Sequence, residues 1–101
     1  MKTKIKYNEL KELSNCILTK SDEILNEYQE IDKIIDSVMY AWNGSDSKEF
    51  ISEAKKNIVE EKEKVSNIKS FGEKLGTISS DYNQIDNKFL DNIKKESLDN
   101  G

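Results

Sequence analysis

The sequence contains no proline and no histidine, and only four of its 101 residues are glycine. Proline interrupts helices more strongly than any other residue, so its absence leaves the chain free to form long helices. Histidine is the commonest general base and a frequent metal ligand, so its absence removes much acid–base and metal chemistry. These absences favour an all-helical protein without a histidine-based active site.

A single cysteine, Cys16, rules out an intrachain disulfide and provides too few ligands for a metal site. We interpret it as a small apolar residue beside a helix contact, with an interchain disulfide as the alternative. No apolar run approaches the ~20 residues of a membrane-spanning helix. The basic start, residues 1–9, has no apolar segment behind it, so we expect neither a membrane span nor a Sec-type signal peptide. The protein then either stays in the cytoplasm or leaves by another export route.

Apolar residues make up 35% of the chain and charged residues 36%, whereas ordinary domains are about 45–50% apolar. Such a chain cannot build a thick core, but it can form amphipathic helices that bury a narrow stripe. Its net charge is −4, with acids and lysines interspersed. This argues against binding to nucleic acid, which attracts a basic face, and against an anionic membrane surface. The length fits one domain.

Apolar side chains recur every seven residues in the first part of the chain, at Leu10, Ile17, Ile24, Ile31 and Val38. A second line with the same spacing is extended backward by two serines and consists of Ser14, Ser21, Tyr28, Ile35 and Trp42. Together the lines have the 3-and-4 spacing of a coiled-coil contact. We predict one helix over about residues 7–42, which would be about 50 Å long and would need a partner along its whole length.

The segment after Trp42 carries a helix stop followed at once by a helix start. Gly44 can adopt the left-handed conformation that ends many helices. Asp46 can cap the next helix in a capping box with Glu49, and either neighbouring serine is an alternative cap. A stop and a start this close together predict a tight helical hairpin with its turn at residues 43–46.

A second helix is predicted over about residues 47–93, followed by a polar tail at 94–101. Its two neighbouring seven-residue lines are Ile51, Ile58, Val65, Gly72, Ser79, Asp86 and Ile93, and Ala54, Ile68, Leu75, Tyr82 and Phe89. The pattern is interrupted at Glu61, where the helix is polar all round. Gly72 and Gly76 lie on one face, and they indicate either a close approach of two helices or a locally flexible helix.

Two helices alone share one line of contact and leave half of each broad stripe in water. A pair of hairpins would bury the rest as a four-helix bundle. We therefore predict an all-α fold, a helix-turn-helix hairpin of two long antiparallel helices that dimerises into a four-helix bundle. The predicted core of hairpin and dimer comprises Leu10, Ile17, Ile24, Tyr28, Ile31, Ile35, Val38, Ile51, Ile58, Val65, Ile68 and Leu75.

No residue pattern indicates catalysis. Cys16 lacks an imidazole partner that would activate it, and the sequence has no glycine-rich phosphate-binding loop. Acidic residues are plentiful, but on exposed helices they are solvated or form weak ion pairs with lysines one turn away. Acid–base catalysis needs a pocket that perturbs such groups. We predict no enzyme activity, no catalytic residues, no metal and no cofactor.

Trp42 and Gly44 form a Trp-x-Gly motif near the middle of the chain, and Phe50 follows eight residues after the tryptophan. This motif between two long helices, in a chain of this length, resembles the WXG-motif hundred-residue family. Members are early-secreted-antigen-like proteins exported by type VII secretion systems. The resemblance covers essentially the whole chain. It implies a hairpin that dimerises as a four-helix bundle, and export without a cleaved signal peptide.

The family also carries a C-terminal export element, Tyr-x-x-x-Asp/Glu, which Tyr82 and Asp86 match. One helical turn places these two residues on one face. Alternatively, Tyr82 continues the apolar line and Asp86 faces solvent. Tyr28 and Asp32 match the same pattern, but we interpret Tyr28 as part of the core. In the family, the turn motif of one subunit and this element of the other are thought to form a bipartite signal.

Two features depart from the family pattern, namely a helix that continues after Asp86 and the polar interruption at Glu61. The resemblance implies a secreted substrate or adaptor that acts through protein–protein contact and is recognised by the secretion ATPase. The alternative is a cytosolic partner or chaperone that pairs with a larger toxin and targets it for export. A plain coiled-coil subunit is a third possibility. The expected partner is a second copy of the chain, a paralogue or a toxin.

Overall fold

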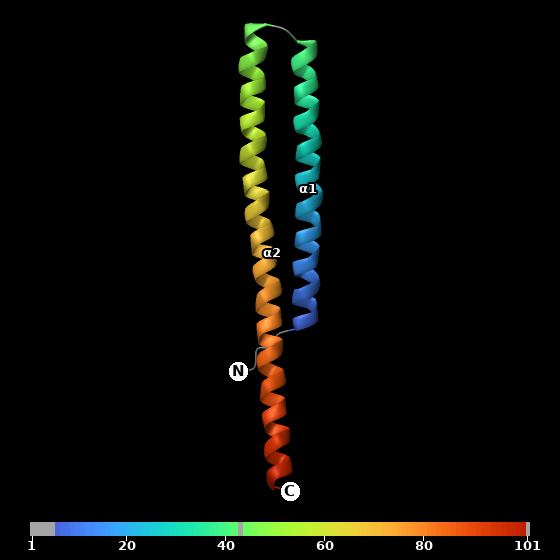
Figure 1. Ribbon diagram of the computed structural model, residues 1–101, viewed down its shortest axis with the longest axis vertical. Coiled ribbons are helices and arrows are strands. Elements are labelled where there is room, and N and C mark those ends of the chain that lie inside the picture. Colours follow the sequence, from blue (N-terminus) through green and yellow to red (C-terminus); the bar gives the residue numbers. More distant parts are fainter. Residues whose placement is uncertain (1–5, 43, 101) are drawn as a thin grey trace.

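The computed structural model describes residues 6–42 and 44–100, and among these the side chains of 97–100 are not described. The described residues form two helices, α1 (Tyr7–Ala41) and α2 (Ser45–Asn100). The helices run antiparallel, side by side, and are joined by a short turn (Figure 1). The molecule is a rod with extents of 86 × 21 × 17 Å. The predicted all-helical hairpin of two long antiparallel helices is thereby confirmed for this part of the chain.

Helix α1 ends at Ala41, because the backbone of Trp42 is extended, with φ −122° and ψ 100°. The Trp42 amide still donates a hydrogen bond to the carbonyl oxygen of Val38 at 2.9 Å, which satisfies one acceptor of the last turn. Gly44 does not adopt a positive φ, so the predicted left-handed glycine stop is wrong. Asn43, the middle residue of the motif, lies outside the described residues.

Helix α2 begins two residues earlier than predicted, at Ser45. Asp46 therefore lies inside the first turn and is not the N-cap. The positive end of the helix dipole stabilises its negative charge there. The predicted capping box with Glu49 is accordingly wrong. The hydroxyl of Ser47 donates instead to the carbonyl oxygen of Gly44 at 2.6 Å and is buried at the start of the helix.

The end of α2 also differs from the expected tail at 94–101. The helix continues to Asn100, and no glycine or proline occurs between residue 93 and that point to stop it. With 56 residues against 35 in α1, α2 runs past the first residue of α1 and continues alone to the C-terminal end (Figure 1).

The contact between the helices follows one seven-residue line on each of them. On α2 the line consists of the buried residues Ile51, Ile58, Val65, Gly72 and Ser79. On α1 it starts with the buried Ser14 and Ser21 and continues with the half-buried Tyr28 and Ile35. Large residues thus fill the half of the rod near the turn, and small residues fill the other half.

The remaining residues of the predicted core lie at the sides of this contact. Leu10, Ile17 and Leu75 are half-buried. Ile24, Ile31, Val38 and Ile68 are exposed in the single hairpin, so the contact between α1 and α2 does not bury them. The physical reason is geometric, because a single antiparallel helix covers one line of residues and leaves the neighbouring line open. Their burial in a dimer stays a prediction.

The helices approach closely where the small residues lie. The Ser14 hydroxyl donates to the carbonyl oxygen of Gly72 at 2.6 Å. A Cβ placed on Gly72 would lie 2.7 Å from Cγ2 of Ile17, and one placed on Gly76 would lie 2.8 Å from Oγ of Ser14. Of the two interpretations of these glycines, the structure supports the close approach of two helices.

Candidate functional site

The turn end of the rod carries an exposed aromatic pair. The ring centroids of Trp42 and Phe50 lie 5.7 Å apart with the planes tilted by 52°, a separation typical of aromatic contacts. Trp42 is 43% exposed and Phe50 is 59% exposed. Gly44 lies between them in sequence, and a Cβ placed on it would have nothing within 4 Å. The three predicted motif residues therefore gather at one end of the hairpin and leave two aromatic faces accessible.

The opposite end of α1 brings together the C-terminal motif and a residue of the first helix. Tyr82 and Asp86 are both exposed. The hydroxyl of Tyr7 donates a hydrogen bond to Oδ2 of Asp86, across 79 positions of sequence. The hydroxyl of Ser79 donates to the carbonyl oxygen of Tyr7 at 2.8 Å. Tyr7 is thus attached to α2 at two points that lie one heptad apart.

The electrostatics of this cluster act on the phenol of Tyr7. Its hydrogen bond to Asp86 raises the pKa of Tyr7 from its ordinary value of 10.0 to about 12. Desolvation, the negative charge of Asp86 and the nearby phenol of Tyr82 act in the same direction. All of them disfavour a second negative charge beside the carboxylate. The hydroxyl of Tyr7 is therefore a stable hydrogen-bond donor at neutral pH.

Sequence reasoning treated Tyr7 only as the approximate start of a helix, and its contact with Asp86 was not expected. One signal was available, because Tyr7 lies seven residues before Ser14, on the same line as Ser21. Asp86 lies seven residues after Ser79 on the facing line of α2. Extending both lines by one step pairs the tyrosine with the aspartate. Asp86 is exposed to solvent, as the alternative interpretation held, and it also accepts the hydrogen bond from Tyr7.

The two motif regions lie at opposite ends of the paired helices (Figure 1). Trp42 follows the last residue of α1, and Asp86 contacts the first residue of that helix. A helix of 35 residues is about 50 Å long. One hairpin therefore does not present both motifs to a single receptor surface.

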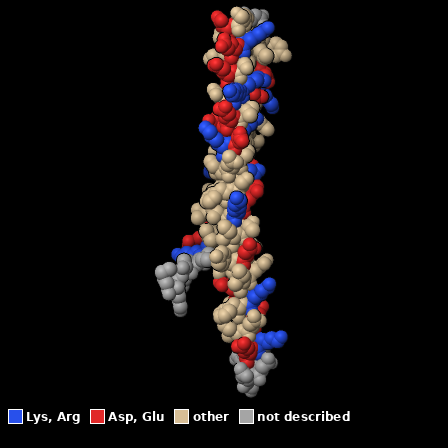
Figure 2. All heavy atoms as spheres, turned by 90° about the vertical axis from the view of Figure 1, so that its left-hand side faces the viewer, with Lys and Arg blue, Asp and Glu red and all other residues tan. Residues whose placement is uncertain are grey.

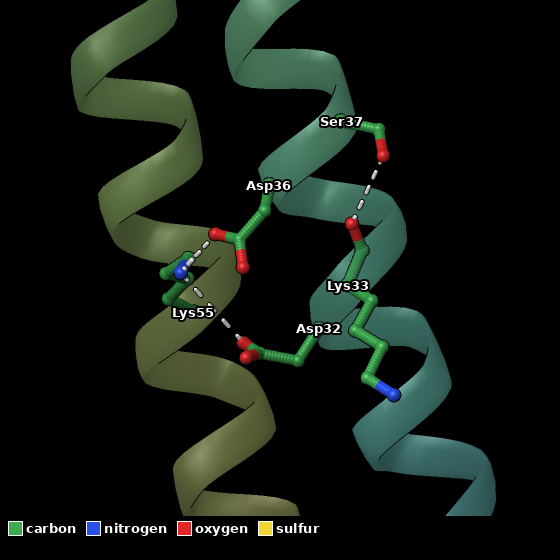
Figure 3. A network of polar contacts seen from close by, with 5 residues as sticks. All are labelled: Asp32, Lys33, Asp36, Ser37 and Lys55. Atoms are coloured by element: carbon green, nitrogen blue, oxygen red, sulfur yellow. Dashed lines mark hydrogen bonds and ion pairs between the residues drawn. The ribbon is translucent and has the colours of Figure 1, made fainter.

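One side of the rod is joined by ion pairs between the helices, and we call it the charged side. Lys55 of α2 lies between Asp32 and Asp36 of α1 (Figure 3), with its ammonium 4.0 Å from Asp32 and in closer contact with Asp36. Lys69 pairs in the same way with Asp22 at 2.7 Å. The hydrogen bond to Asp36 raises the pKa of Lys55, and the hydrogen bond to Asp22 raises the pKa of Lys69.

The other side of the rod is apolar and uncovered, and we call it the open side. Helical periodicity places one stripe of large side chains from each helix there. Its exposed or half-buried members are Leu10, Leu13, Ile17, Ile24, Ile31, Ile34 and Val38 of α1, and Ile68, Phe71, Leu75, Ile78, Tyr82, Ile85 and Phe89 of α2. A run of exposed apolar residues this long is unusual for a protein that acts alone.

The open side is not uniform along α2. Figure 2 shows the face of α2 that is turned away from α1, where charged side chains are denser near the turn than in the middle of the rod. The seven-residue apolar line of α2 is interrupted at Glu61, which pairs with Lys64 at 3.1 Å. The apolar stripe of α2 therefore begins at Ile68 and continues along the helix toward Phe89.

Cys16 is exposed, with a free thiol, and lies at the edge of the open side. It lines a shallow, apolar hollow of about 200 Å³ together with Ile17, Ile24, Val65 and Ile68. This placement agrees with a small residue beside the helix contact. An interchain disulfide stays a prediction.

Residues 6–42 and 44–96, whose side chains the structure describes, contain no group of three or more cysteine, aspartate or glutamate side chains arranged to hold a metal ion. Within the same ranges, neither helix has an apolar stretch long enough to cross a membrane. No protein-family model matches the chain, and no curated protein or solved structure shows significant similarity to it. The motifs, the hairpin and its two sides are therefore the features from which a function can be proposed.

Proposed function

We propose that this chain is a small secreted substrate or adaptor of a bacterial type VII secretion system, which acts through protein–protein contact and not as an enzyme. The observation that carries the proposal is the exposed Trp42–Phe50 pair at the turn of a two-helix hairpin. A tryptophan that only closed the helix contact would be expected to bury its ring. Here the ring is accessible at the tip of the rod, where a receptor can reach it.

The open side supports a dimer as the working form of the protein. Ion pairs already join the helices on the charged side. On the open side, large residues such as Ile31, Ile34 and Phe71 are in water, and burying them stabilises by about 25 cal/mol per Å² of apolar surface. A second hairpin laid against the open side would complete a four-helix bundle. The partner is a second copy, a paralogue or the helical domain of a toxin.

The separation of the two motifs supports a signal shared between two subunits. Trp42 and Asp86 lie at opposite ends of α1 in one hairpin. In an antiparallel pair of hairpins, the turn of one subunit lies near Tyr82 and Asp86 of its partner. The secretion ATPase would then recognise a composite surface that forms only in the dimer, and export would be limited to assembled pairs.

Export assays with a matched control test this proposal. Trp42→Ala should abolish the ATPase-dependent appearance of the protein in the culture medium while its helicity is unchanged. Tyr40→Ala is the control, because Tyr40 is an aromatic residue near the turn that is 88% exposed. Tyr82→Ala should abolish export as Trp42→Ala does. Normal export of both the Trp42 and the Tyr82 variants would refute the proposal.

The exposed open side also favours the second candidate function, a cytosolic chaperone that pairs with a larger toxin. A stripe that is continuous over both helices suits an obligate heterodimer as well as a homodimer. A native mass measurement separates the two. A homodimer in the purified protein supports the secreted substrate. Insolubility of the chain alone, with recovery as a strict 1:1 complex with a toxin, supports the chaperone.

A further inference from the structure

Tyr7 and Asp86 meet where α1 begins, and Tyr82 lies one helical turn before Asp86 on α2. Tyr7 comes from α1, and Tyr82 and Asp86 come from α2. Ser79 holds the backbone of Tyr7, and Asp86 holds its hydroxyl. Asp86 of the C-terminal motif is therefore in contact with the first helix, and Tyr82 lies between Ser79 and Asp86, the two residues that hold Tyr7.

We infer that Tyr7 is a positioning residue of this motif, which holds the carboxylate of Asp86 so that a protein receptor recognises Tyr82 and Asp86 together. The inference rests on the proposed function, in which these two residues are recognised during export. It adds a residue from the other end of the sequence to the recognition surface. The surface then exists only when α1 is folded against α2.

The chemistry of a carboxylate allows it to serve Tyr7 and a receptor at the same time. An ionised aspartate has two oxygens and about four acceptor positions. Tyr7 uses Oδ2 of Asp86 and leaves Oδ1 for another donor. The matching receptor surface carries a lysine, arginine or amide donor next to an apolar pocket. That pocket takes the ring of Tyr82, which is 46% exposed, and the neighbouring Ile85.

A positioned carboxylate binds more tightly than a mobile one. An aspartate on an exposed helix changes rotamer freely, and ordering it on binding costs free energy. The hydrogen bond from Tyr7 removes part of that cost before the receptor arrives. The phenol of Tyr7 keeps its proton throughout the physiological pH range, because even its ordinary pKa of 10.0 lies well above that range. Loss of this one hydroxyl should therefore weaken recognition although Tyr82 and Asp86 are both present.

Two other roles for the contact predict different results. If Tyr7 only fastens the end of α1, any substitution that loosens that end should act in the same way. If Tyr7 covers Asp86 and competes with the receptor, its removal should improve recognition. Ser79→Ala separates the first role from positioning, because it removes the bond to the Tyr7 backbone and leaves the tyrosine hydroxyl in place.

The experiment measures the full-length protein in the culture medium of the producing bacterium, with a strain lacking the secretion ATPase as the baseline. Four variants are compared, namely Tyr7→Phe, Ser79→Ala, Asp86→Asn and the double variant of Tyr7 and Asp86. Tyr40→Phe is the control for the loss of a phenol elsewhere on α1. Circular dichroism of each purified variant monitors helicity and the unfolding midpoint.

Tyr7→Phe is expected to lower export roughly fivefold, the effect typical of one hydrogen bond, with a smaller loss for Ser79→Ala and with Tyr40→Phe close to wild type. The double variant should be no worse than Asp86→Asn alone, because both act through the same carboxylate. Unchanged or increased export of Tyr7→Phe, or an equal loss in Ser79→Ala, would overturn the inference alone. Normal export of Asp86→Asn and Tyr82→Ala would overturn the proposed export signal itself.

Discussion

The hydroxyl of Tyr7 donates a hydrogen bond to the carboxylate of Asp86 and so joins the first residue of α1 to α2. The contact lies where α1 begins, and α2 continues beyond it (Figure 1). It also connects residues that lie 79 positions apart. Local preferences of the chain do not determine such a contact, and it forms only when the whole hairpin has the correct register.

An alkaline titration should detect this contact directly. The pKa of Tyr7 is raised to about 12 by its bond to Asp86, so one phenolate band should appear late in a spectrophotometric titration. Tyr7→Phe should remove the late band, and Asp86→Asn should move it to lower pH because the negative charge is gone. A late band that is unaffected by both substitutions would belong to another tyrosine and would contradict the contact.

The same shift predicts how stability depends on pH. Folding favours the protonated phenol, because the pKa of Tyr7 is higher in the folded chain than its ordinary value of 10.0. This contribution is complete below about pH 10 and is lost as the pH rises toward about 12. The free energy of unfolding, measured with urea, should fall more across that pH window for the wild type than for Tyr7→Phe. The variant also corrects for the deprotonation of lysines, which both proteins share.

The close approach of the helices at Gly72 predicts an unequal response of the two glycines to alanine. A new methyl at Gly72 would meet Cγ2 and Cβ of Ile17 at 2.7 and 3.0 Å, and a β-branched side chain in a helix is stiff. A new methyl at Gly76 would meet only the hydroxyl oxygen of Ser14 within 3.4 Å. Overpacking typically costs about 1–3 kcal/mol, whereas alanine gains about 1 kcal/mol of helix propensity.

Gly72→Ala should therefore lower the free energy of unfolding by up to about 2 kcal/mol, and Gly76→Ala should change it much less. Because the propensity gain is the same at both positions, the difference between the variants compares the clash with the stiff Ile17 side chain with the contact to the Ser14 hydroxyl. Urea titrations followed by circular dichroism give this difference. Equal stability of the two variants would mean that the helices do not approach closely at Gly72.

The sequence was sufficient to predict the hairpin because helix periodicity and the position of the turn are local properties of the chain. It was not sufficient to decide which of two neighbouring seven-residue lines faces the other helix. Ile24 and Ile31 are more apolar than Ser14 and Ser21, yet the serines are the buried ones. Small side chains lie inside because they allow the helices to come close.

The backbone geometry at the ends of the helices could also not be predicted from the sequence. The motif glycine was predicted to stop α1 in a left-handed conformation, but the chain turns at Trp42 with extended dihedral angles. Several backbone geometries can end a helix within two residues, and composition does not select among them. The contact of Tyr7 with Asp86 was missed for a related reason, since polar partners at the end of a rod leave no apolar periodicity to follow.

The two sides of the rod predict opposite outcomes for oligomerisation. Ile31→Lys places a charge on the open side and should dissociate the proposed dimer while the hairpin stays helical. Lys55→Gln changes the charged side, where exposed ion pairs contribute little and are screened by salt. It should leave the dimer intact and have almost no effect on stability at high salt.

Sedimentation equilibrium at micromolar concentration measures this pair of variants. The expected result is a dimer for the wild type and for Lys55→Gln, and a monomer for Ile31→Lys. A wild-type monomer would refute the dimer altogether. Dissociation by the Lys55 variant and not by the Ile31 variant would place the interface on the charged side.

Gly44 allows the structural and the recognition roles of the turn motif to be separated. A methyl added at Gly44 has open space around it, and the residue does not adopt a positive φ. Alanine is a poorer residue than glycine before a helix, but it also reduces the entropy of the unfolded chain. These opposing effects should leave the free energy of unfolding within about 1 kcal/mol of wild type.

If a receptor recognises the turn through close contact with its backbone, Gly44→Ala should lower export although the fold and its stability are unchanged. Ser45→Ala is the matched control, since it changes the adjacent residue, which is also exposed. Thermal unfolding by circular dichroism and the amount of protein in the culture medium are measured in parallel. Full export of the Gly44 variant would leave Trp42 and Phe50 as the recognised residues and reduce the glycine to a residue that the turn tolerates but does not need.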